Sequence, residues 1–223
     1  MNPNGKVQMY FQRHAQQFDQ LYQQNPHPFN RLNQWLRQPF YRRFELTLAA
    51  CGDVQGKRIL DVGCGSGRYS VTLAEQGAEV VGIDFAGNML ALAQRLAREH
   101  RVSARCRFIE ADFLEYNFTE TFDISLAIGF FDYISNPRPF FEKLCLLTRE
   151  KVIVTYAPPG GWRTLQRWIR YRLQGCPVYF HSQQAMVTHF AAAGYQNWQF
   201  VGSWAVALPI AIYIPIYKKG GAR

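Results

Sequence analysis

The stretch "RILDVGCGSGRYSVTLAEQGAEVVGID", residues 58–84, constrains the fold of this chain more than any other. "RILDV" is an apolar run of strand length, "RYSVTLAEQ" has helical spacing and stops at Gly77, and "AEVVGID" predicts a second strand. Glycines between the first strand and the helix permit a tight turn and the close approach of a ligand to the backbone. Strand, glycine-rich turn, helix, strand and acidic residue in this order outline a nucleotide-binding unit.

The spacing of the glycines distinguishes between nucleotides. A dinucleotide fingerprint requires Gly-x-Gly-x-x-Gly, in which the third glycine lets the helix pack closely on the strand. Here the glycines are Gly63, Gly65 and Gly67, and Arg68 stands where that third glycine belongs. The turn therefore disfavours a nicotinamide enzyme.

The rest of the chain predicts one α/β domain. A length of 223 residues suits one sizeable domain, and a hydrophobic fraction of 48% favours a packed globule. Further strands are predicted in "CRFIEAD", "FDISLAI" and "KVIVTYA", with helical segments between them, which indicates parallel strands and right-handed crossovers. "YQNWQFVGS" and "VALPIAIYIPIY" can close the sheet as two antiparallel strands. We expect a Rossmann-like, doubly wound, mostly parallel seven-stranded sheet that ends in an antiparallel hairpin.

Two flanking segments have a different character. Residues 1–50 predict amphipathic helices that form an N-terminal cap or lid, and residues 158–194 predict an insertion that covers the substrate. Residues 200–217 carry no charge, which suits either a buried hairpin or a membrane contact. Pro209 and Pro215 would break a helix, so we expect the hairpin.

Two carboxylates follow predicted strands. Asp84 ends the second strand, where a carboxylate can accept hydrogen bonds from both hydroxyls of a ribose; the alternative is an ordinary helix cap. Asp112 in "EADF" follows the third strand and can bind the amino group of an adenine; the alternative is a plain loop aspartate.

The motifs "ILDVGCGSG", "VVGID" and "EADF" resemble the successive signatures of class I S-adenosylmethionine-dependent methyltransferases over about residues 57–157. The resemblance implies S-adenosyl-L-methionine as cofactor, a small-molecule acceptor and a methyltransferase domain over residues 51–223. The cofactor-binding residues it implies are Asp61, Gly63, Cys64, Gly65, Gly67, Asp84, Phe85, Asp112, Phe113 and Ile128.

The resemblance also implies a role for each part of this set. The glycine backbone would approach the methionine part of the cofactor, with Asp61 near its amino group. Asp84 would bind the ribose, Phe85 would flank the adenine, and Asp112 with Phe113 would hold the adenine edge. "FDQLY", residues 18–22, resembles the "YDxxY" lid of small-molecule members, with a phenylalanine in place of the first tyrosine.

Methyl transfer needs alignment first, and a general base only where the acceptor must lose a proton. The candidate bases are His181, Asp132 and Tyr133. His181 lies beside a predicted helix cap, and the other two follow the fourth strand, so structural roles in capping or packing stay open for all three. No metal site is predicted, because carboxylates and histidines do not cluster at convincing spacing.

The segment "GFFDYI" after the fourth strand bears on the acceptor. It lacks the "Asn-Pro-Pro-Tyr" type of tetrapeptide that is expected in enzymes acting on exocyclic amines. Its aromatic residues instead favour an apolar or flat acceptor. The layout after the fifth strand also resembles tetrapyrrole carboxyl O-methyltransferases.

Charge raises the prospect of an anionic partner, because the net charge is +9. In the predicted helix 162–173, Arg163, Arg167 and Arg170 fall on one side. That side can be a solvated face, bind an anionic substrate or make a peripheral membrane contact. Nucleic acid is disfavoured, since no nucleic-acid module is visible. A non-catalytic module that binds a lipid or anion through this face remains an alternative to an enzyme.

Two further features bear on localisation. Five scattered cysteines predict reduced thiols, and the N-terminus lacks an apolar signal core. We therefore expect a cytoplasmic protein. The sequence predicts no oligomeric state.

Overall fold

A single sheet, whose strand order reverses once, lies at the centre of the computed structural model, which describes residues 3–20, 31–195, 197–201 and 210–214. The order is β3-β2-β1-β4-β5-β7-β6. The strands are β1 Arg58–Val62, β2 Glu79–Asp84, β3 Cys106–Glu110, β4 Phe122–Ala127, β5 Thr148–Thr155, β6 Asn197–Val201 and β7 Ile210–Ile214. The first five strands pair in parallel, and β7 lies antiparallel to both β5 and β6. The predicted mixed α/β, Rossmann-like fold is confirmed by these five parallel strands.

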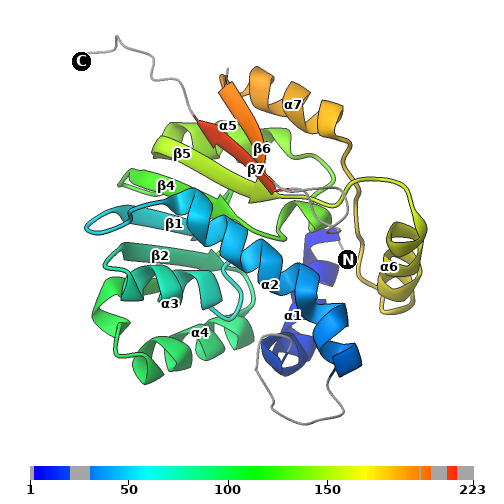
Figure 1. Ribbon diagram of the computed structural model, residues 1–223, viewed down its shortest axis with the longest axis horizontal. Coiled ribbons are helices and arrows are strands. Elements are labelled where there is room, and N and C mark those ends of the chain that lie inside the picture. Colours follow the sequence, from blue (N-terminus) through cyan, green and yellow to red (C-terminus); the bar gives the residue numbers. More distant parts are fainter. Residues whose placement is uncertain (1–2, 21–30, 196, 202–209, 215–223) are drawn as a thin grey trace.

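Helices cover both faces of the sheet (Figure 1). On one face lie α2 Arg31–Cys51, α3 Arg68–Glu75 and α4 Gly87–Glu99, which contact one another in that order. On the other face lie α5 Arg138–Leu147 and α7 Gln183–Ala192, which also contact each other. Parallel strands joined by helical crossovers produce this three-layer arrangement.

Two hydrophobic clusters hold the layers together, one on each face of the sheet. Side chains alternate along a strand, so Ile59 of β1 enters the cluster beneath α2 and α3, while Leu60 and Val62 enter the cluster beneath α5 and α7. In β5, Ile153 joins the first cluster and Val152 the second. Buried strands with apolar residues on both faces explain why the strand segments read as nearly continuous apolar runs.

Two helix starts follow their sequence signals. Ser182 is the N-cap of α7, and its Oγ accepts a hydrogen bond from the Ala185 N–H at 3.1 Å. Asn136 Oδ1 accepts a weaker bond from the Arg138 N–H at 3.3 Å, where α5 begins. Local side chains thus satisfy backbone donors at these ends.

Two helices lie beyond the ends of β4 and β5, on the side where those strands terminate (Figure 1). They are α1 Pro3–Gln20, which contacts α4, and α6 Trp162–Leu173. Within the described part of the chain, no helix combines the length and apolar character that crossing a membrane requires. Residues 21 and 22 of the lid-like segment, with Pro209 and Pro215, lie outside the described residues.

Gly67 provides a test of how tightly α3 and α4 pack. Its φ is +75°, and an added Cβ would lie 2.7 Å from Ala93 Cβ and 3.0 Å from the Ala93 Cα. Gly67→Ala should therefore lower the free energy of unfolding by about 2–4 kcal/mol, from left-handed strain plus overpacking. Gly175→Ala is the matched control, because Gly175 has φ +70° and nothing within 4 Å of an added Cβ. Urea denaturation measures both, and equal losses would refute close packing at Gly67.

Candidate functional site

The glycine loop between β1 and α3 lies where the strand order reverses, since β1 pairs with β2 on one side and with β4 on the other. The N–H groups of Gly63 and Cys64 both donate to the Ile83 carbonyl, at 2.8 and 3.2 Å, which ties the loop to the end of β2. Gly63, Gly65 and Gly67 have φ of +67°, +54° and +75°. Glycine is the residue that adopts positive φ readily, so three glycines at alternate positions permit this loop conformation. Doubly wound sheets bind their ligands at the point where the strand order reverses.

Asp84 joins the ends of β1 and β2. Its Oδ2 accepts the Gly65 N–H at 2.9 Å, and its Oδ1 accepts the Ala86 N–H at 2.9 Å. Burial raises the pKa of Asp84, and the hydrogen bonds from Ala86 and Gly65 oppose that rise. The N-cap of α4 is Ala86, so Asp84 does not occupy the capping position that was the alternative. Each carboxylate oxygen retains capacity for a further hydrogen bond, which suits a pair of ribose hydroxyls.

Asp61 lies under the glycine loop. It is 2% exposed, and its Oδ2 accepts a hydrogen bond from Ser70 Oγ at 2.6 Å. Burial raises the pKa of Asp61 to about 6, the Ser70 hydroxyl opposes this shift, and the charge of Asp84 adds to it. A nearby cation would relieve the cost of the buried charge, as the amino group of S-adenosylmethionine would.

The start of α3 supplies a different kind of binding group. Gly67 is its N-cap, without a side-chain cap, and the first turn carries no acidic residue. The N–H groups of the first turn and the helix dipole at such an end favour an anion, so they suit the carboxylate of the same cofactor. The residues present therefore fit S-adenosylmethionine.

Asp112 follows β3, next to the end of β2, because Asp84 pairs in register with Glu110. Its Oδ1 accepts the Leu114 N–H at 2.8 Å. The Phe113 side chain is 4% exposed and stacks on Phe140, with ring centroids 6.1 Å apart. Phe113 therefore belongs to the core beneath α5, and any contact with an adenine would come from its backbone.

Cys64 is a second implied residue whose side chain faces the core. It is 8% exposed, and a Cβ added at Gly82 of β2 would lie 2.9 Å from the Cys64 Sγ. Burial raises the pKa of the Cys64 thiol well above its usual value, so the group stays neutral. Its contribution to ligand binding would also come from the backbone.

Helix α1 lies over Phe85. Gln8 Nε2 donates to the Phe85 carbonyl at 2.7 Å, and Asn88 Nδ2 of α4 donates to the Gln12 carbonyl at 3.0 Å. The Phe11 and Phe85 side chains both pack against the buried pair Ala86 and Met89. These contacts hold α1 beside the position at which an adenine would meet Phe85.

Ile128 follows β4 and is half-buried against the cluster beneath α2 and α3. The next residue, Gly129, donates its N–H to Thr155 Oγ1 at 2.7 Å, which joins the ends of β4 and β5. Phe130 then lies against the glycine loop, since a Cβ added at Gly63 would be 2.7 Å from Phe130 Cδ2. The fourth strand thus ends next to the loop.

Asp132 holds three segments together. Its Oδ1 accepts the Ala157 N–H at 2.7 Å, and its Oδ2 pairs with the Arg167 guanidinium at 2.7 Å. The Asp132 side chain is 2% exposed and that of Arg167 22% exposed. Burial alone would lower the pKa of Arg167, but the charge of Asp132 keeps it above its usual value. Both carboxylate oxygens are engaged in linking the ends of β4 and β5 to α6.

Tyr133 extends this link. Its hydroxyl donates to the Tyr171 hydroxyl of α6 at 3.1 Å, and burial raises its pKa well above the ordinary value. The Tyr10 hydroxyl of α1 donates to Gln174 Oε1 at 3.0 Å, and the Tyr10 ring contacts Tyr171. Phe11 of α1 contacts the Tyr133 ring edge-on at 5.0 Å. These aromatic residues join α1, α6 and the segment after β4.

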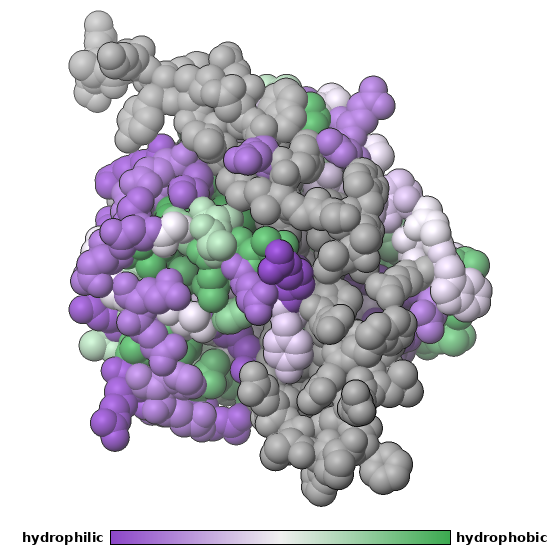
Figure 2. All heavy atoms as spheres, in the orientation of Figure 1, coloured by the Kyte–Doolittle hydropathy of each residue, from purple (hydrophilic) through white to green (hydrophobic). Residues whose placement is uncertain are grey.

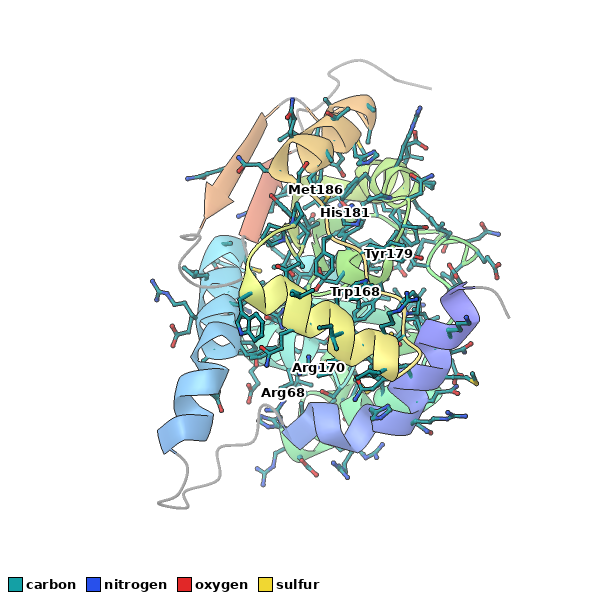
Figure 3. The ribbon with its side chains drawn as sticks, turned by 90° about the vertical axis from the view of Figure 1, so that its right-hand side faces the viewer. Arg68, Trp168, Arg170, Tyr179, His181 and Met186 are labelled. Carbon is teal, nitrogen blue, oxygen red and sulfur yellow. The ribbon has the colours of Figure 1, made fainter. Side chains whose placement is uncertain are left out.

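His181 lies in the segment between α6 and α7, near Tyr179 and Met186 (Figure 3). Its Nε2 is 2.9 Å from the Ile134 carbonyl and 3.2 Å from the Phe131 carbonyl. A ring nitrogen that faces two carbonyl oxygens carries the proton and donates. This geometry suits a structural role, in which His181 links the segment before α7 to the segment after β4. In a neutral ring, the lone pair is then on Nδ1.

Sequence reasoning missed several residues of this region. Ser70, Gln8 and Tyr171 reach the site from helices, where the sequence gives no signal of their partners. Thr155 could have been found, because it ends β5 and parallel strands end at one edge of the sheet. In the described parts of the chain, no three His, Cys, Asp or Glu residues come together as a metal site would require.

Curated relatives share part of this chain. The ubiquinone biosynthesis O-methyltransferase of Bordetella avium is 30% identical over 120 residues, which cover 54% of this chain and 46% of that protein. The release factor glutamine methyltransferase of Chlorobaculum tepidum is 33% identical over 179 residues, covering 78% of this chain and 47% of that protein. The chain thus spans about half the length of these relatives.

Solved structures share its fold. The magnesium protoporphyrin IX methyltransferase of Synechocystis PCC 6803, with S-adenosylhomocysteine bound, superposes with a TM-score of 0.79 at 19% identity, over 96% of this chain and 100% of that one. A protein described as a cyclase superposes with a TM-score of 0.62 at 19% identity, over 78% of this chain and 82% of that one. The fold alone therefore does not decide the reaction.

A family profile described as a methyltransferase domain matches residues 53–193, which is more than half of the chain. That range contains the glycine loop, Asp84 and Asp112. The chain belongs to the methyltransferase domain family, as its class I S-adenosylmethionine-dependent motifs predict.

Proposed function

We propose that this protein transfers a methyl group from S-adenosyl-L-methionine to a small-molecule acceptor. The observation that carries the proposal is the Asp84 carboxylate, which is fixed between the Gly65 and Ala86 N–H groups at the reversal point of the sheet. Membership of the methyltransferase domain family supports it. When bound, the cofactor supplies an activated methyl group on a sulfonium centre.

The cofactor-binding residues follow from the contacts described above. Asp84 binds the ribose hydroxyls, Asp61 balances the amino group, and the start of α3 receives the carboxylate. The loop glycines bring the backbone close, and the Cys64 N–H lies in the same loop. Phe85 flanks the adenine, Asp112 and the backbone of Phe113 bind its edge, and Ile128 closes the side next to β4.

Residues 1–50 act as a cap and residues 158–194 as a cover over the acceptor, in a methyltransferase domain of residues 51–223. The contact of α1 with α4 and the Tyr10 to Gln174 bond support this division. The antiparallel pairing of β7 with β5 and β6 supports a sheet of seven strands that ends in a hairpin.

His181, Asp132 and Tyr133 hold this cover in place, and none needs to act as a general base. The Asp132 oxygens, the Tyr133 hydroxyl and the Nε2 of His181 are engaged with backbone or with α6. Alignment within a closed site supplies much of the rate of such a displacement. An acceptor that already carries a nucleophilic atom, such as a carboxylate, suits a site of this kind.

The tetrapyrrole carboxylate is the second candidate acceptor class. The full-length similarity in fold to the magnesium protoporphyrin IX methyltransferase favours it. Aromatic side chains at the end of β4, among them Phe130, suit a flat acceptor. The alternative is a non-catalytic module that binds a lipid or an anion. In that case the residues that fit the cofactor would have no role in methyl transfer.

Methyl transfer is tested with methyl-labelled S-adenosylmethionine, magnesium protoporphyrin IX and a panel of phenols and carboxylic acids. Labelled product with any of these acceptors supports the enzyme, and product with the tetrapyrrole selects the second candidate. Tight binding of S-adenosylhomocysteine with no transfer across the panel would favour the non-catalytic module.

Asp84→Asn should weaken the binding of S-adenosylhomocysteine by about 10- to 100-fold, because the amide loses the charge and one acceptor oxygen. Asp123→Asn is the control. Asp123 also accepts a hydrogen bond from a backbone N–H, that of Arg58 at 2.8 Å. It lies at the start of β4, whereas the candidate site lies at the edge where the parallel strands end. Titration of the three proteins measures the affinities, and an unchanged affinity in Asp84→Asn would exclude its ribose role.

The raised pKa of Asp61 predicts how affinity depends on pH. A bound cation lowers the pKa from about 6, so affinity for S-adenosylhomocysteine is full above that value. It should fall by up to about tenfold per unit as the pH drops below 6, because binding then requires proton release. Ser70→Ala removes a hydrogen bond that lowers the Asp61 pKa, so the loss should begin at a higher pH. Identical pH profiles for wild type and Ser70→Ala would contradict the assignment.

His181→Gln and His181→Ala separate a fastening role from a base. Glutamine can place an N–H near the Ile134 and Phe131 carbonyls, whereas alanine leaves both without this donor. We expect alanine to lower the free energy of unfolding by about 1–3 kcal/mol and glutamine to lower it much less. Denaturation gives these values. Loss of methyl transfer in a fully stable His181→Gln protein would instead identify a base.

A further inference from the structure

Helix α6 presents its large apolar side chains to solvent, while Arg167 and Tyr171 face the protein. Trp162 is 74% exposed and Leu173 is 83% exposed, although both are large apolar residues. The other exposed apolar residues of α6 are Leu165, Trp168 and Ile169. Their spacing places the five on one continuous side of the helix. We call this side the α6 stripe.

The opposite side of α6 fixes its orientation. Arg167 forms the buried ion pair with Asp132, and Tyr171 accepts the Tyr133 hydroxyl. Thr164 Oγ1 also donates to the Pro158 carbonyl at 3.4 Å. These polar contacts prevent the helix from turning its apolar stripe inward. A continuous exposed apolar surface of this kind marks an interaction site.

Positive charge surrounds the stripe. Arg170 and Arg172 are exposed, and their guanidinium groups lie over the rings of Tyr171 and Trp168, at 5.0 and 5.2 Å. The surrounding sequence has no acidic residue to offset them. Residues 151–223 contain eight Lys and Arg and no Asp or Glu, whereas residues 1–150 contain 17 Lys and Arg against 16 Asp and Glu. Almost all of the net charge of +9 therefore belongs to the part of the chain that includes α6.

We propose that the α6 stripe docks the protein on the surface of a membrane that contains anionic lipids. Tryptophan, leucine and isoleucine insert at the boundary between headgroups and acyl chains, and arginines beside them bind lipid phosphates. A second copy of this chain fits less well, because pairing two stripes would bring the arginines of both copies together.

The position of α6 on the molecule agrees with this role. It lies at the periphery, with apolar residues at the right-hand edge of the space-filling view (Figure 2). Figure 3 shows α6 in front of the sheet, with Trp168 and Arg170 on this helix. Docking through α6 turns the edge of the sheet that carries Asp84 and the glycine loop toward the lipid. The inference goes beyond the proposed function and does not depend on it, because vesicle binding is measured without methyl transfer.

The test is sedimentation of the full chain with two kinds of vesicle, phosphatidylcholine alone and phosphatidylcholine mixed with phosphatidylglycerol. Wild type should bind the mixed vesicles and bind the neutral ones far more weakly. The double variant Trp162→Gln, Leu173→Gln should bind mixed vesicles at least about tenfold more weakly, since two exposed apolar anchors are lost. Leu146→Gln is the matched control: Leu146 is 81% exposed but lies on α5, and its binding should equal that of wild type.

The arginine contribution is tested separately. Arg170→Gln, Arg172→Gln should weaken binding to mixed vesicles by roughly fivefold per residue, and added salt should weaken wild-type binding in the same direction. All four substituted side chains are exposed, so thermal unfolding of the variants should match wild type. The proposal is overturned if wild type fails to bind mixed vesicles, or if the stripe variant binds as well as the Leu146 control. It is also overturned if light scattering shows that wild type is a dimer, that the stripe variant is a monomer and that vesicles do not dissociate the wild-type dimer.

Discussion

The candidate site depends on the hydrogen bonds of the half-buried Asp84 carboxylate. It lies at the end of β2 and binds the N–H groups of Gly65 and Ala86, so it fixes the loop after β1 and the turn before α4 at once. Burial raises its pKa, which means that the fold holds a charge there at a cost in stability. A ligand that binds both carboxylate oxygens offsets this cost, and a pair of vicinal hydroxyls has that geometry.

A buried ion pair fixes the position of α6. The Asp132 ion pair with Arg167 links the segment after β4 to α6, and the Ala157 N–H brings in the end of β5. A buried ion pair is weak evidence for stability but strong evidence for a defined arrangement, since removing one partner leaves an uncompensated charge. The tyrosine contacts add α1 to the same assembly. The ion pair that links α6 to the sheet therefore also directs the α6 stripe outward.

The sequence was sufficient for features that depend on local periodicity. Runs such as "RILDV" and "AEVVGID" predicted strands, and a carboxylate at a strand end predicted the position of Asp84, because parallel strands end at one edge. It was insufficient where direction depends on packing. Phe113 and Cys64 follow strands as expected, yet their side chains turn into the core. The partners of Asp132, Tyr133 and His181 lie 25 to 50 residues away in the chain, and no spacing rule reveals them. The exposure of the α6 stripe was also not predictable, because periodicity reveals an apolar side without saying which way it faces.

Calorimetric titration with S-adenosylhomocysteine, with NADH as the comparison, tests the central claim most directly. We expect saturable binding of one S-adenosylhomocysteine per chain and no binding of NADH, because Arg68 stands where the dinucleotide fingerprint needs a glycine. Binding of NADH with no binding of S-adenosylhomocysteine would contradict the assignment of the Asp84 and glycine-loop site to this cofactor.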